Sequence, residues 1–151
     1  MEAELIFMMG QYEARFPTDR LYAGNHMWAR EANGVIQFGF TGYAVRLLQD
    51  VYFLEWSIDA GSLVRERQEI GNIESKKAES ALFAPIAGTL IRFNQELLRD
   101  PSAINVDKYG SGWLFEMSGK GRGLLSPPDY LQHLSAVWEV TQRTIKGQLN
   151  E

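Results

Sequence analysis

The hydrophobic positions of the chain fall into short runs separated by turn-forming residues, a pattern typical of a mainly β protein. The segments 35–40 and 51–56 are apolar and rich in β-branched and aromatic residues, so each predicts a strand. Between them, Thr41 precedes a run from residue 42 to 48 that suits a short helix with Thr41 as its N-cap. The turn residues at 59–61 should end the second strand.

The next part of the chain predicts a hairpin. Residues 69–84 contain two β-capable arms around a polar centre, and a turn near residues 75–78 fits them best. Beyond Pro85, residues 89–93 predict another strand, and residues 95–99 predict a short helix that starts after Asn94.

A long C-terminal helix should follow the segment Ser126-Pro-Pro-Asp129, which combines a serine cap, prolines in the first turn and an acid at the positive end. Apolar residues then recur at roughly helical spacing: Tyr130, Leu134, Val137, Trp138, Ile145 and Leu149. Most of this helix should therefore pack on the β core, while its last turns fray.

Composition narrows the class of protein. A chain of 151 residues with 45% hydrophobic content predicts one domain. Its net charge of −4 and the absence of a basic cluster argue against nucleic acid, and no apolar stretch is long enough to span a bilayer, so a cytoplasmic protein is expected.

The residues also limit the chemistry. The chain has no cysteine, and His26 and His133 lack metal-ligand spacing. We therefore expect no disulfide, no nucleophilic thiol and no metal site, and any redox chemistry must come from an attached group.

At the predicted hairpin the sequence becomes specific. Residues 74–78 are Glu-Ser-Lys-Lys-Ala, residues 83–88 are Phe-Ala-Pro-Ile-Ala-Gly, and Asn94 follows. This series resembles the E-S-V-K-A … Y-A-P-V-S-G … N signature of the glycine cleavage H protein family. The resemblance extends from about residue 16 to about residue 130 through three further segments: His26-Met-Trp28, Gly39 to Ala44, and Asn105 to Leu114.

The family's lipoyl lysine corresponds to Lys77, the lysine directly before the alanine, whereas Lys76 replaces a valine. Lipoyl domains tend to carry a glycine sixteen residues before the lysine and another eleven after it, and Gly61 and Gly88 occupy these positions. The resemblance implies that the lipoate-attaching enzyme recognises the residues around the hairpin: Glu74, Ser75, Ala78, Gly61 and Gly88.

The resemblance also implies a fold and a role. The expected fold is mainly β, a flattened barrel or sandwich of two small sheets of the lipoyl-domain type, with short helices and a longer C-terminal helix. Residues 1–15 would form an N-terminal extension, 16–130 the carrier domain and 131–151 the helix packed on it. The protein would hold lipoate covalently on Lys77 and shuttle an intermediate between partner enzymes without catalysing a reaction itself.

The chain departs from the family where the loaded arm would lie. Family members shelter an aminomethyl group in a cleft, and the corresponding cleft candidates here are His26, Met27, Leu47 and Ala81. Met27 replaces a glutamate, Ala81 an aspartate, and Leu47 a histidine of some members. Each change removes a charge or a hydrogen-bond partner, so the cleft suits a neutral or sulfur-bearing arm better than an amine.

Several alternatives stay open. Glu79 is either a substitute for the missing acids or a solvated charge. The opening from Phe16 to Tyr22 resembles H-like lipoate-binding proteins of bacterial sulfur oxidation of the heterodisulfide-reductase-like type, whose arm would carry sulfur to partners in a sulfur-oxidising complex. An unlipoylated binding module is a third reading. A biotin carrier is disfavoured, because its lysine normally lies between methionines.

Overall fold

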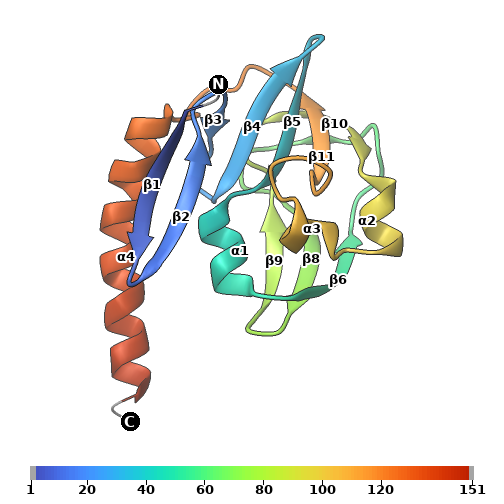
Figure 1. Ribbon diagram of the computed structural model, residues 1–151. Helices are drawn as coiled ribbons and strands as arrows, with labels where there is room; N and C mark the ends of the chain where they lie inside the picture. The colour runs from blue at the N-terminus through green and yellow to red at the C-terminus, as the bar shows by residue number, and fades with distance from the viewer. Residues whose placement is uncertain (1–2, 150–151) are drawn as a thin grey trace.

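The computed structural model describes residues 3–149, and side chains as far as residue 142, as three sheets and four helices (Figure 1). The largest sheet has the order β3 (Leu21–Tyr22), β4 (Met27–Ala32), β5 (Val35–Phe40), β11 (Phe115–Ser118), β10 (Gly88–Phe93) and β7 (Leu63–Val64). A second sheet contains β6 (Val51–Trp56), β8 (Glu69–Ser75) and β9 (Glu79–Phe83), and a third contains β1 (Glu4–Met9) and β2 (Tyr12–Pro17). The helices are α1 (Gly42–Leu48), α2 (Gln95–Arg99), α3 (Ala103–Val106) and α4 (Pro127–Leu149).

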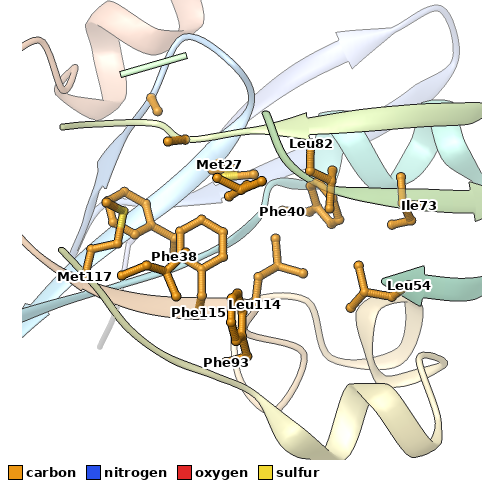
Figure 2. Close-up of a cluster of buried hydrophobic side chains, with 14 of the residues drawn as sticks. Met27, Phe38, Phe40, Leu54, Ile73, Leu82, Phe93, Leu114, Phe115 and Met117 are labelled. Atoms are coloured by element: carbon orange, nitrogen blue, oxygen red, sulfur yellow. The ribbon is translucent and has the colours of Figure 1, made fainter. Parts of the chain in front are cut away.

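The main core lies between the six-stranded and three-stranded sheets. Phe38 and Phe115 pack at one end of this core, and Ile73 and Leu54 lie toward the other (Figure 2). Alternate residues of β5 and β8 face inward, as expected for strands with one buried face. The predicted mainly β fold class is confirmed, with the sheets open and packed as a flattened sandwich rather than closed into a barrel.

The local signals in the sequence placed most elements correctly. The strands at 35–40 and 51–56 and the hairpin formed by β8 and β9 are confirmed. Thr41 caps α1 by accepting a hydrogen bond from the Ala44 N–H at 3.4 Å, and Asn94 caps α2 in the same way. The Ser126 hydroxyl accepts a hydrogen bond from the Asp129 N–H at 3.3 Å, at the start of α4. These caps satisfy N–H groups that the first helical turn leaves unpaired.

The N-terminal hairpin and α4 form a second, mostly aromatic cluster with the strands beside them (Figure 1). Residues 4–17, assigned from sequence largely to an N-terminal extension, form β1 and β2. Tyr22 and Tyr130 stack with ring centroids 4.8 Å apart, and Phe16 meets Tyr130 edge-on at 5.5 Å. We call this group the aromatic cluster; its buried members are Met9, Ala14, Phe16, Tyr22, Trp28, Tyr43, Tyr130 and Leu134.

The apolar stripe of α4 follows the predicted spacing over its first part. Tyr130 and Leu134 are buried, and Trp138 is half-buried with its ring edge-on to Tyr43. Ile145 and Leu149, expected to continue the stripe, lie beyond the residues whose side chains are described, so fraying of the last turns stays a prediction. No helix within residues 3–149 is long and apolar enough to cross a membrane.

Candidate functional site

The tip of the β8–β9 hairpin presents two adjacent lysines to solvent. Lys76 and Lys77 are exposed, whereas Ser75, directly before them, is only 5% exposed. The Ser75 N–H and hydroxyl donate to the Ala78 carbonyl oxygen at 2.8 and 3.0 Å, and the Ala78 N–H donates back to the Ser75 hydroxyl at 3.2 Å. These bonds close the turn from within, so the lysine side chains project from a fixed loop.

The tip is also held from outside by the connection between α1 and β6. The Lys76 N–H donates to the Asp50 carbonyl oxygen at 2.8 Å, and the Lys77 N–H donates to the Leu48 carbonyl oxygen at 3.3 Å. In Figure 1 this connection crosses the hairpin near its tip. The backbone of both lysines is therefore fixed, while their side chains remain free for chemistry.

A cleft of about 400 Å³ lies beside this tip and brings together all four cleft candidates from the sequence. His26 comes from the loop before β4, Met27 from the start of β4, Leu47 from the end of α1 and Ala81 from β9. The remaining lining is mostly apolar and includes Phe40, Ala44, Leu48, Ile73 and Leu82. Met27, Phe40, Ile73 and Leu82 also belong to the main core, so the cleft floor is the edge of that core (Figure 2).

The cleft offers little charge. Its lining residues, all within the described part of the chain, include no aspartate or glutamate. Glu79 is exposed and lies outside this lining, opposite Glu74 in the hairpin register. A cation in this cleft would thus lack a carboxylate partner from the wall.

His26 joins the cleft to the aromatic cluster. Its Nδ1 lies 2.9 Å from the Tyr130 hydroxyl, which lies 3.0 Å from the Thr41 hydroxyl. Burial, and next the neighbouring His133, lower the pKa of His26 to about 4, so the ring is neutral at physiological pH. Burial raises the pKa of Tyr130, which keeps its phenol protonated. His26 is therefore a hydrogen-bonding side chain rather than a charged one.

The two glycines lie apart from the tip. Gly88 pairs with Val64 where β10 meets β7, and Gly61 lies just before β7, so both belong with the six-stranded sheet rather than with that of the hairpin. A side chain at Gly88 would overlap the Ser118 carbonyl oxygen, and Gly61 has a φ of +90° that favours glycine. The local backbone therefore favours glycine at both positions, independently of Lys77.

Two asparagines complete the site and were not predicted as members of it. The Asn25 side-chain amide donates to the Phe83 carbonyl oxygen at 3.0 Å, which ties the cleft wall to the end of β9. Asn105 bonds to the backbone of Gln49 and Val51, on either side of Asp50. Asn105 opens a segment already matched to a family pattern, but that pattern gives no sign of which backbone groups it binds.

Comparison with known proteins assigns the fold and the site to a family. The model of the family described as "Glycine cleavage H-protein" matches residues 20–135, which include the hairpin, the cleft and the start of α4. The chain belongs to the glycine cleavage H-protein family. Members of this family carry lipoate and serve as carrier subunits rather than catalysts, and they act with partner enzymes of the glycine cleavage system.

Individual members of the H-protein family are similar over most of their length. The glycine cleavage system H protein of Methylacidiphilum infernorum is 36% identical over 118 residues, covering 78% of this chain and 87% of that protein. The H protein of Psychrobacter cryohalolentis is 41% identical over 105 residues, covering 69% and 82%. A crystal structure of a glycine cleavage system H protein from Mycobacterium marinum superimposes with a TM-score of 0.69 at 31% identity, covering 80% of this chain and 99% of that one.

Proposed function

We propose that this protein carries lipoate covalently on Lys77 and presents it alternately to partner enzymes and to its own cleft. The single observation that carries the proposal is the pairing of an exposed lysine, on a backbone held by hydrogen bonds, with an apolar cleft beside it. An attaching enzyme needs an accessible amine at a defined position, and the turn from Ser75 to Ala78 supplies one.

The residues present fit the group. The Lys77 amine can form an amide on a flexible stem, and the wall made by Met27, Leu47 and Ala81 can cover apolar atoms and exclude water. When bound, lipoate supplies a disulfide that can be reduced, loaded and reoxidised, which the cysteine-free chain lacks. Glu74 and Ser75 would contribute to recognition by the attaching enzyme.

The first experiment is modification in a host with active lipoylation, followed by intact mass and peptide mapping. We expect one lipoyl increment on Lys77, retained in Lys76→Arg and lost in Lys77→Arg. Arginine keeps the charge and the length at each position but cannot form the lipoyl amide, so the two variants are matched. An increment that survives in Lys77→Arg, or no increment in the parent protein, contradicts the proposal.

The cleft favours a second candidate for the cargo. In glycine cleavage the arm would carry an aminomethyl group, whose ammonium prefers a carboxylate partner when it is removed from water. The wall here presents alanine, leucine and methionine at the relevant positions. This observation supports a neutral or sulfur-bearing cargo, as in the H-like lipoate-binding proteins of sulfur oxidation.

The two cargoes can be distinguished by adding an acid to the wall. Ala81 is half-buried, so Ala81→Asp can place a carboxylate at the cleft with little strain. For a sulfur carrier, we expect the parent protein to hold an aminomethyl group poorly and Ala81→Asp to lengthen the lifetime of that loaded form. If the aminomethyl form of the parent instead lives as long as that of Ala81→Asp, and Glu79→Gln shortens it, the result would favour glycine cleavage. Glu79 would then be the carboxylate that pairs with the ammonium group.

A further inference from the structure

Asn105 lies in α3, twenty-two residues beyond the end of β9, and its side chain bridges a short piece of backbone. Its Oδ1 accepts a hydrogen bond from the Val51 N–H at 2.9 Å, and its Nδ2 donates to the Gln49 carbonyl oxygen at 2.6 Å. The two bonds hold the residues on either side of Asp50. An amide that uses both its donor and its acceptor in this way restricts the backbone between them.

The restricted backbone is the one that receives the hairpin tip. The Asp50 carbonyl oxygen accepts the Lys76 N–H, and the Leu48 carbonyl oxygen accepts the Lys77 N–H. Gln49, between these two acceptors, has a φ of +63°, a conformation that a residue with a side chain adopts at a cost. This backbone conformation is stabilised by contacts from outside the connection, and the two hydrogen bonds of the Asn105 side chain supply them.

The other contacts of the tip are bonds within the turn and the pairing of its first residue, Ser75, with Val51 of β6. The three bonds between Ser75 and Ala78 are internal to the turn, so they fix its shape without fixing where the turn lies relative to the cleft. Lys76, Lys77 and Ala78 are exposed, so packing adds little. The orientation of the turn therefore depends on the backbone at residues 48–51, which includes both acceptors of the lysine N–H groups and the partner of Ser75.

We propose that Asn105 is a positioning residue for the modified lysine. By holding Gln49 and Val51 it fixes the backbone that anchors the tip, and so determines which of two adjacent lysines is presented to the attaching enzyme. Because the chain carries lysine at both positions, the type of side chain does not distinguish them, and the position of each amine in the turn does. The inference rests on the proposed attachment to Lys77.

The test compares Asn105→Ala with Asn94→Ala. Asn94 is a matched control, because its side chain also bridges backbone, donating to Ser111 and Trp113 and accepting from Glu96, but it does so away from the tip. The first readout is the amide exchange rate of Lys76 and Lys77 in the unmodified protein. Loss of two hydrogen bonds should raise this rate about tenfold in Asn105→Ala and leave it unchanged in Asn94→Ala.

The second readout is the site of modification. We expect Asn105→Ala to be lipoylated several-fold more slowly and to show a larger share of modification on Lys76, whereas Asn94→Ala keeps the parental ratio. Asn105→Asp retains the acceptor for the Val51 N–H and should lie between the parent and the alanine variant. This variant also serves if the alanine variant does not fold.

Parental exchange rates and a parental ratio of Lys77 to Lys76 in both Asn105 variants would overturn the inference, as would equal changes in Asn94→Ala. Failure of the parent protein to accept lipoate is a different result. It would contradict the proposed function, while the exchange rates would still show whether Asn105 holds the tip.

Discussion

The hairpin tip and the aromatic cluster are held by opposite means. At the tip, backbone and turn hydrogen bonds hold the chain while the side chains of Lys76 and Lys77 are exposed. In the aromatic cluster, buried rings such as those of Tyr22 and Tyr130 hold α4 against segments from the first part of the chain. The lysine proposed to carry lipoate lies where the fold does not depend on its side chain, and the rings that stabilise the fold lie away from it.

The largest expected effect contrasts one residue from each region. Tyr130→Ala removes a fully buried ring and its hydrogen bonds, and should lower the free energy of unfolding by about 3–5 kcal/mol. Lys77→Ala should change it by less than about 0.5 kcal/mol while abolishing modification. Denaturant unfolding of both variants measures the contrast. A strongly destabilised Lys77→Ala would mean that the lysine side chain supports the fold.

An intermediate effect is expected from pH at His26, which joins the aromatic cluster to the cleft. Its pKa is lowered to about 4 from 6.5, so between these values the unfolded chain binds more protons than the folded one. The contribution of neutral His26 to the free energy of unfolding is therefore fully present above pH 6.5. It should fall by roughly 2 kcal/mol as the pH drops toward 4.5.

The matched variant for this pH effect is His26→Asn. His26 has a backbone φ of +70°, in the left-handed region, and asparagine tolerates this conformation better than most residues do. Between pH 7.5 and 4.5, the free energy of unfolding should change less with pH in the variant than in the parent. The difference is the contribution of His26. Parallel curves would assign the pH dependence to other groups.

The smallest effect is expected inside the turn. Ser75→Ala removes the hydroxyl bonds to Ala78 and should cost about 1–2 kcal/mol, because the buried position gives water little access to the freed groups. Ser80→Ala, at an exposed serine of β9, should cost less than about 0.5 kcal/mol. Thermal unfolding compares the two variants through their melting temperatures. Equal shifts in melting temperature would show that the Ser75 hydroxyl contributes no more to stability than an exposed serine does.

Local signals made much of the fold predictable. Thr41, Asn94 and Ser126 each precede a helix whose N–H groups they satisfy, so the residue and its effect lie within one turn. The hairpin was predictable for the same reason. The cleft candidates came from the family resemblance, and the structure brings all four together.

Contacts between distant segments were not predictable in this way. Asn105 binds residues more than fifty positions earlier, and no spacing rule specifies that contact. The N-terminal hairpin had a local signal that the prediction did not use: Gly10, with a φ of +65°, at the turn between two β-capable runs. Its packing on α4 depends on side chains from opposite parts of the chain.

The order of synthesis gives the aromatic cluster a consequence for folding in the cell. β1 and β2 leave the ribosome long before Tyr130 and Leu134 of α4, which complete the cluster. Until then, the apolar face of the early hairpin, with Phe16 buried in the final fold, has no helix to cover it. The nascent chain thus exposes an apolar surface for most of translation, and chaperones bind surfaces of this kind.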